Sequence, residues 1–128
     1  MKTNSTTADA RAQQIKLQLL QKRAKAYLPY RLAFLAQKHG FEYSLGKLGL
    51  RKTRWGSCTS NKVISLNIAL MTLSDGDRPS ELIDYVIIHE LCHTRHMNHS
   101  RNFWEEVAKY DPDFKIHRKK LKSHAPRI

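Results

Sequence analysis

The feature that most constrains this chain is a run of histidines between residues 89 and 99. The segment His89-Glu90-Leu91-Cys92-His93 fits the pattern His-Glu-x-x-His, and His99 follows six residues after His93. Positions i and i+4 share one face of an α-helix, so His89 and His93 can offer their imidazoles to a single metal ion. Glu90 lies beside the first of them and can reach water at that ion without binding the ion itself. The segment therefore predicts a helix that carries a hydrolytic metal site.

A catalytic zinc ion needs a third protein ligand and keeps one position open, and His96 and His99 are the nearest histidines that could supply it. On a helix that ran straight on, His96 would share the face of His89 and His93, but it would lie about 10 Å along the axis from His89. Three imidazoles spread over that length cannot all bind one ion at about 2.1 Å. A ligand placed after the chain has turned back is more suitable, which favours His99.

The residues around His99 suit such a turn. Asn98 can adopt the left-handed conformation that ends a helix, and Ser100 can cap the next one. His99 also has the spacing of the metzincin motif His-Glu-x-x-His-x-x-Gly-x-x-His, with His96 in the place of the glycine. The turn need not be the same as in that motif, so His96 stays open as an alternative ligand.

Two other interpretations of the segment also stay open. A glutamate could be the third ligand, as in enzymes of the thermolysin type, although Glu105 and Glu106 follow rather early for that role. Alternatively, the segment is a histidine-rich helix end with imidazoles in solvent and Glu90 as an ordinary surface carboxylate.

Composition places the chain among ordinary globular proteins. Its 128 residues suit one domain, and 41% of them are hydrophobic and 27% charged. No apolar run approaches the roughly 18 residues of a membrane span, and the N-terminus lacks the apolar core of a secretory signal. The two cysteines, Cys58 and Cys92, are too few for a disulfide framework. We therefore expect a cytoplasmic protein without a membrane partner.

Charge is distributed unevenly along the chain. Nine of the 11 acidic residues lie between residues 75 and 113, whereas residues 10–41 carry seven Lys or Arg, residues 114–128 carry six, and neither segment has an acid. Basic terminal segments of this kind can bind nucleic acid through its phosphates. A solvated surface is the simpler interpretation, because no nucleic-acid motif or aromatic platform accompanies them.

Hydrophobic periodicity predicts helices at residues 8–28 and 30–39. Pro29, which lies between them, should kink or end the first helix. Gly40 is a fitting stop for the second helix. Two strands should follow, at about residues 41–50 and 63–68.

The first strand continues as an extended segment at residues 51–58, and a turn follows at residues 59–62. The chain then returns as the second strand, which predicts a hairpin. A free strand edge beside a metal site could hold an extended peptide through main-chain hydrogen bonds. Further helices are predicted, in order, at residues 69–73, from Ser80 to about 96–98, from Ser100 to about Tyr110, and from Asp111-Pro112 to about Ser123. We expect an α+β fold with one domain over residues 8–123, a disordered segment at 1–7 and a loose tail at 124–128.

Four ordered motifs resemble the family of YgjP-like zinc metallopeptidases, which is related to SprT-like peptidases. They are Arg54-Trp55-Gly56-Ser57-Cys58, Ile64-Ser65-Leu66-Asn67, the segment from Ile83 to His93, and Asn98-His99-Ser100 with Phe103-Trp104. The resemblance covers residues 32–121 and implies a minimal zincin-like fold with an active-site helix. It also implies His89, His93 and His99 as zinc ligands, Glu90 as the catalytic acid/base, and a strand with Trp55, Gly56, Ser57 and Cys58 near the substrate cleft.

These observations predict a zinc metallopeptidase with one Zn²⁺ per chain, which acts on a peptide or protein substrate. Water activated by the zinc ion attacks the peptide carbonyl, and Glu90 serves as general acid/base. Tyr85, Tyr110 and His96 are candidates for stabilising the oxyanion, and Asp84 and Asp111 are candidates for orienting the ligands.

Two alternatives remain. One is a SprT-like protease that acts on DNA-bound proteins, supported by the basic termini. The other is a non-catalytic binding module stabilised by zinc, in which His96 or a cysteine would be a fourth ligand.

Overall fold

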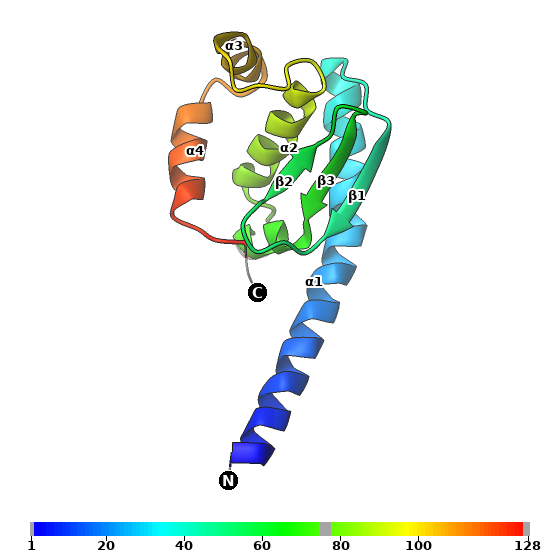
Figure 1. Cartoon of the computed structure of the whole chain (residues 1–128), viewed down its shortest axis with the longest axis vertical. Coiled ribbons are helices and arrows are strands. Elements are labelled where there is room, and N and C mark those ends of the chain that lie inside the picture. Colours follow the sequence, from blue (N-terminus) through cyan, green and yellow to red (C-terminus); the bar gives the residue numbers. More distant parts are fainter. Residues whose placement is uncertain (1, 75–77, 127–128) are drawn as a thin grey trace.

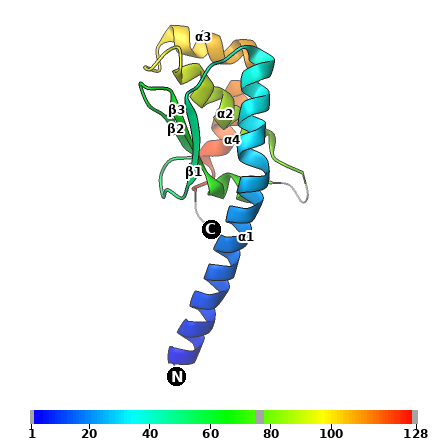
Figure 2. The ribbon, with the colours of Figure 1, turned by 90° about the vertical axis from the view of Figure 1, so that its right-hand side faces the viewer.

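The computed structural model describes residues 2–74 and 78–126. A small three-stranded sheet has helices packed on one of its faces (Figures 1 and 2). The elements follow in the order α1 (Lys2–His39), β1 (Leu45–Gly49), β2 (Gly56–Cys58), β3 (Val63–Asn67), the 3₁₀ helix η1 (Ile68–Leu73), α2 (Glu81–His93), α3 (Arg101–Tyr110) and α4 (Phe114–Lys122). The expected α+β class, with a long N-terminal helix and helices after the sheet, is confirmed. None of the described helices is long and apolar enough to cross a membrane.

Helix α1 runs unbroken through Pro29, so the expectation of two helices divided there is wrong. Pro29 removes the hydrogen bond to the carbonyl of Lys25, but both residues lie on the exposed side of the helix, where water can reach that carbonyl. Leu28 and Leu32, on the other side, are fully buried and hold the helix to the core. Packing of the buried face therefore outweighs the one lost bond.

The N-terminal end of the chain also differs from the sequence prediction. Helix α1 includes residues 2–7, for which we expected disorder, and Met1 lies outside the described residues. Its N-terminal half projects beyond the body of the protein (Figure 1), and among the residues whose burial is described Leu20 is the first buried hydrophobic one. Gly40 ends the helix with a φ of 75°, as its position predicted. Of the expected loose tail, residues 124–126 form no helix or strand, and residues 127–128 lie outside the described part.

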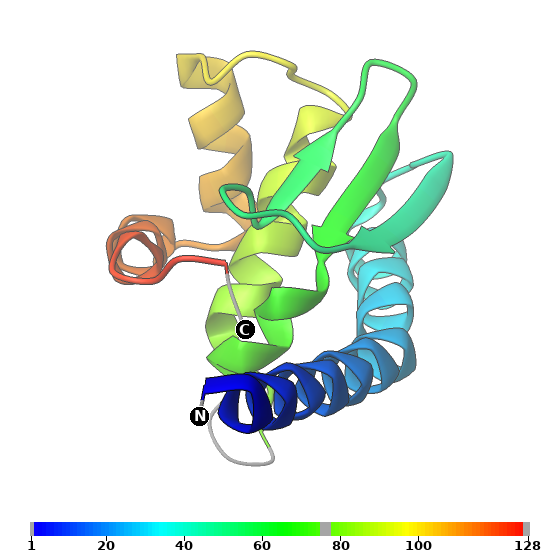
Figure 3. The ribbon, with the colours of Figure 1, turned by 60° about the horizontal axis from the view of Figure 1, so that its bottom comes forward.

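The sheet has the strand order β1-β3-β2, with β1 parallel and β2 antiparallel to β3. A hairpin does form around the predicted turn, but its arms are β2 and β3, and the turn contains Lys62 with a φ of 63°. The strand expected at 41–50 is β1, which runs parallel to β3, so its expected place in the hairpin is wrong. Ile64 and Leu66 of β3 are buried against the helices. Strand β2 forms one edge of the sheet and lies beside α2 (Figure 3).

Helix α2 is the centre of the core and begins where the sequence predicted. The side chain of Ser80 accepts a hydrogen bond from the Leu82 amide. The helix ends at His93, before the predicted 96–98, because the amides of Thr94 and Arg95 already bond in a tighter turn.

The turn after α2 does not use a left-handed Asn98, since Lys62 is the only non-glycine residue with positive φ in the described part of the chain. Ser100 caps α3 as predicted, by accepting a hydrogen bond from the Phe103 amide. The expected cap of the last helix by Asp111 is wrong. Helix α4 begins at Phe114, and the Asp111 carboxylate bonds to His117 instead.

Candidate metal centre

Three imidazoles converge at the C-terminal end of α2. The Nε2 atoms of His89 and His93 are 3.2 Å apart, those of His93 and His99 are 3.1 Å apart, and those of His99 and His89 are 3.2 Å apart. His89 and His93 lie one turn apart on α2, as their spacing predicted. The segment of residues 94–100 then crosses from α2 to α3 (Figure 3) and brings His99 back over the helix end.

This arrangement fits a bound metal ion. Nitrogen ligands about 2.1 Å from a tetrahedral ion lie about 3.4 Å from one another, which is close to the separations observed here. The Nδ1–H of His93 can donate to the carbonyl of His96 at 2.9 Å, which leaves its Nε2 with a free lone pair. Neutral imidazoles facing one another cannot all be satisfied by hydrogen bonds among themselves, so a cation is the natural partner of the cluster.

Burial favours the neutral form that a metal ligand needs. It lowers the pKa of His89 to about 3, with further lowering by the charges of His93 and His99. Burial also lowers the pKa of His93. Both imidazoles are therefore neutral at physiological pH, with lone pairs available.

Phe103 of α3 is the floor of the cluster. Its ring is fully buried and stacks on His93, with centroids 4.4 Å apart, while His89 and His99 meet it edge-on at 4.9 and 5.1 Å. Trp104 stacks on the outer side of His99 with centroids 5.8 Å apart. The sequence indicated Phe103 and Trp104 as part of a family motif, without a role at the metal site. The contact of Phe103 with all three imidazoles depends on how α3 packs.

The alternative ligands are engaged elsewhere. His96 turns its ring towards Glu106, with Nε2 3.1 Å from Oε1. Arg95 and Tyr110 both donate to the other oxygen of Glu106, at 2.9 and 3.1 Å. Glu105 pairs on the surface with Arg101. In the part of the chain that the structure describes, no further His, Cys, Asp or Glu joins the three-histidine cluster.

Glu90 lies on the same helix end and is buried, with 6% of its surface exposed. Burial raises the pKa of its carboxyl group to about 8, and the positive charge of Arg54 opposes the shift. Gly56 of β2 makes room for it, since a Cβ at this position would lie 3.0 Å from Cγ and 3.1 Å from Oε2 of Glu90. A glycine at this point lets the edge strand approach the carboxylate, a contact that residue spacing alone could not predict.

A cleft of about 350 Å³ opens over these groups. Gly56, Ser57 and Cys58 line it together with His89, Glu90, His93 and His99, and the remaining lining residues are Arg54 and Met97. Trp55 lines an adjoining cavity of about 180 Å³ with Tyr85 and Glu90. The strand segment expected near the cleft thus lies there, and Arg54, which borders both spaces, is an addition to the predicted set.

Of the three oxyanion candidates, only Tyr85 borders a space that contains Glu90. Burial raises the pKa of its phenol to about 12, so it stays a hydrogen-bond donor. Tyr110 and His96 are instead occupied by Glu106.

The candidate orienting carboxylates do not contact the imidazoles that they were expected to orient. Both oxygens of Asp84 pair with Arg31 of α1, at 2.8 and 2.6 Å. Asp111 lies 2.7 Å from His117 of α4. The backbone carbonyl of His96, rather than a carboxylate, orients His93.

Comparison with known proteins is consistent with this site. A family model described as YgjP-like, metallopeptidase domain, matches residues 1–124. Among solved structures, the chain resembles the crystal structure of the metallopeptidase zymogen of Pyrococcus abyssi abylysin, with a TM-score of 0.59 and 23% sequence identity. The likeness covers 72% of this chain and 89% of that chain, and at this identity it is one of fold. Comparison with curated proteins gave no match.

Proposed function

This chain belongs to the family of YgjP-like metallopeptidases, and from that premise we propose that it is a zinc peptidase with His89, His93 and His99 as ligands and Glu90 as general acid/base. The observation that carries the proposal is the convergence of three imidazole Nε2 atoms within 3.2 Å of one another, beside a buried carboxylate.

The donor set favours zinc. Three neutral imidazoles suit Zn²⁺, whereas Mg²⁺ and Ca²⁺ prefer oxygen ligands. Within the described residues no fourth protein ligand closes the cluster, and an open position distinguishes a catalytic zinc site from a structural one. This favours an enzyme over a zinc-stabilised binding module. When bound, the ion would supply Lewis acidity, which polarises a peptide carbonyl and lowers the pKa of water.

Glu90 is suited to move protons in this reaction. Its carboxylate borders the cleft, and a cation on the adjacent imidazoles would favour its ionised form. A carboxylate oxygen of Glu90 would take a proton from the attacking water and then deliver it to the leaving amine. Burial by itself raises the pKa of the carboxyl group, which favours the protonated form that the second transfer needs.

The free edge of β2 offers a place for the substrate. β2 lies at one end of the strand order, so its outer backbone groups can pair with an extended peptide. A peptide bound there would run alongside the cleft that Glu90 borders. The Tyr85 hydroxyl would then be a donor to the carbonyl oxygen as it gains charge.

Glu90→Gln tests the proposal. In zinc-loaded protein we expect kcat/KM on an unfolded protein substrate to fall by about 10²–10⁴-fold, while one ion per chain is retained. Glu42→Gln, at an exposed position, is the matched control and should keep full activity. Unchanged cleavage by Glu90→Gln, or no cleavage by zinc-loaded wild type, would contradict the proposal.

A further inference from the structure

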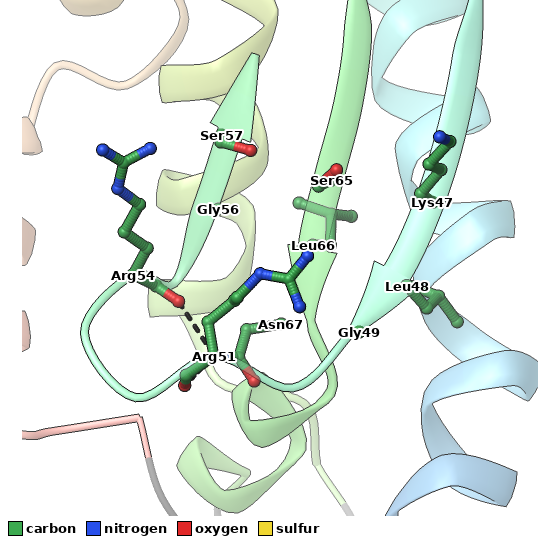
Figure 4. A pocket seen from close by; sticks show the side chains of 10 residues that line it. All are labelled: Lys47, Leu48, Gly49, Arg51, Arg54, Gly56, Ser57, Ser65, Leu66 and Asn67. Carbon is green, nitrogen blue, oxygen red and sulfur yellow. Dashed lines mark hydrogen bonds between the residues drawn. The ribbon is translucent and has the colours of Figure 1, made fainter. Parts of the chain in front are cut away.

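The face of the sheet that points away from the helices bears a small polar concavity (Figure 4) of about 160 Å³. Lys47, Ser65 and Ser57 are register partners across β1, β3 and β2. Register partners project on the same face of a sheet. The concavity therefore has a row of one ammonium group and two hydroxyls as its base.

The loop between β1 and β2 adds Arg51 and Arg54 to the same concavity. In Figure 4 the Arg51 side chain extends towards β3 and Lys47 projects from the neighbouring β1, whereas the Arg54 side chain points away from both, past the outer edge of β2. Asn67 fixes this loop from below. It is 2% exposed, and its Nδ2 donates to the carbonyls of both Arg51 and Arg54 at 2.8 Å. A buried anchor of this kind fixes the backbone of the loop before any ligand arrives, which lowers the entropic cost of ordering the loop on binding.

In the described part of the chain the concavity itself contains no acidic side chain, although Arg54, at its border with the cleft, also faces Glu90. No Asp or Glu lines the concavity, and among the described residues Lys47, Arg51 and Arg54 form no salt bridge. Arg51 makes one long hydrogen bond, 3.4 Å, to the carbonyl of Leu50. An anion that enters the concavity would supply the counter-charge that Lys47 and Arg51 lack among its lining residues.

We propose that this concavity, formed by Lys47, Arg51, Arg54, Ser57 and Ser65, binds a phosphate group. A single carboxylate is already satisfied by one bidentate arginine. The Arg51 guanidinium group, the Lys47 ammonium group and two hydroxyls instead match an anion with more charge and more acceptor oxygens, and Arg54 lies at the border of the site. The group can belong to a free phosphate or to the phosphodiester backbone of a nucleic acid, and both present the same oxygens.

The site is separate from the metal centre, so it can be tested independently of peptidase activity. Arg54, Gly56 and Ser57 border both the concavity and the cleft. The concavity is also lined by Lys47, Arg51 and Ser65, which do not line the cleft. Variants at these last three positions therefore test phosphate binding without altering groups that we place in the catalytic cleft.

The experiment is a titration of ¹⁵N-labelled, zinc-loaded protein with inorganic phosphate at fixed ionic strength, followed by NMR. We expect saturable shifts of the Lys47, Arg51 and Ser65 amides. Arg51→Gln should weaken the affinity by about tenfold, because a charge-assisted hydrogen bond is lost, and Lys47→Gln should weaken it in the same direction. Lys109→Gln, which removes an exposed lysine of α3, should change the affinity less than about twofold.

Two further ligands identify the source of the group. A short oligodeoxynucleotide that shifts the same amides at lower concentration than phosphate, and loses this preference in Arg51→Gln, assigns the site to a phosphodiester. Binding of phosphate alone assigns it to a free phosphate, and both results support the proposal. It is overturned if phosphate leaves these amides unchanged, if Lys109→Gln weakens binding as much as Arg51→Gln, or if hexaglutamate binds there more tightly than either phosphate ligand.

Discussion

The histidines of the metal centre and the histidines that lie just outside it differ in what their ring nitrogens face. In the facing histidines, His89, His93 and His99, the Nε2 atoms point at one another at 3.1–3.2 Å. In the paired histidines, His96 and His117, a ring nitrogen points at a carboxylate, at 3.1 and 2.7 Å. The residue type is the same, and the partner decides the role.

The paired histidines hold elements together. His96 joins the turn after α2 to Glu106 of α3, and His117 joins α4 to Asp111. Each pair is complete within the protein, since a carboxylate accepts what the imidazole donates. The Nε2 atoms of the facing histidines have no carboxylate partner among the described residues, and a bound cation would supply the partner they lack. The comparison therefore predicts that a variant can disturb stability or metal affinity separately, according to which group it touches.

The largest effect should come from Phe103→Ala, which removes the ring against which the three facing histidines pack. Phe103 is fully buried, so the cavity should cost about 3–5 kcal/mol of unfolding free energy. The three imidazoles would also lose the ring that sets their orientation, so zinc affinity should fall in the same variant. Urea denaturation and a zinc titration measure the two effects.

Phe41→Ala is the matched control, because Phe41 packs against side chains that bond to Glu106, the partner of His96. We call Glu106, His96, Arg95 and Tyr110 the paired group. Its ring contacts Tyr110 and carries the Arg95 guanidinium over its face. This variant should lose a comparable amount of stability but keep its zinc affinity. If Phe41→Ala lowers zinc affinity as much as Phe103→Ala, the two groups are not separate.

A smaller effect concerns the unfolding free energy that is lost because the Glu90 carboxyl group is buried in metal-free protein. Burial raises its folded pKa to about 8, from a usual value of 4.5. Folded protein therefore holds the proton up to about pH 8, while unfolded protein releases it above about pH 4.5, and stability falls as the pH rises between these values. Glu90→Gln removes this loss. It should raise the stability of metal-free protein by about 2–4 kcal/mol at pH 8 and by much less at pH 5, as seen in thermal unfolding. A gain that does not depend on pH would contradict this explanation.

Glu106→Gln should have the smallest effect and should act on the paired group alone. Burial by itself raises the pKa of Glu106, but hydrogen bonds from His96 and Tyr110 and the charge of Arg95 lower it overall. The stabilisation is therefore present above the unfolded pKa near 4.5 and is lost as the pH falls through the lower folded value. We expect a loss of about 1–3 kcal/mol at pH 7, which shrinks in acid.

The neighbouring Glu105→Gln is the control for this prediction. Glu105 pairs with Arg101 on the surface, where 59% and 92% of the two side chains are exposed. Surface pairs of this kind contribute little, so denaturation should hardly change, and zinc binding should be intact in both variants. A loss of zinc in Glu106→Gln would mean that the paired group supports the ion directly.

Local patterns predicted the parts of the fold that depend on neighbours in sequence. Ser80 and Ser100 marked the starts of α2 and α3, and the spacing of His89 and His93 placed both rings on one helix face. Pro29 misled the prediction because burial of Leu28 and Leu32 maintains the helix through it. Intrinsic preference is a weak guide where tertiary packing opposes it.

The site could be predicted only in part, for a similar reason. The choice between His96 and His99 depended on where α2 ends, and the tight turn at Thr94 could not be read from spacing. The approach of Gly56 to Glu90 joins residues 34 positions apart in the chain, and it exists only because β2 packs beside α2. Contacts of this kind depend on the packing of the whole domain.

The measurement that tests the central claim most directly is the metal content of His99→Ala and His96→Ala beside wild type, purified in parallel and analysed for zinc per chain. One ion per chain is expected in wild type and in His96→Ala, whose backbone carbonyl still accepts from His93. His99→Ala should lose most of its zinc. Zinc retained by His99→Ala, or lost from His96→Ala alone, would contradict the assignment of the facing histidines as the metal site.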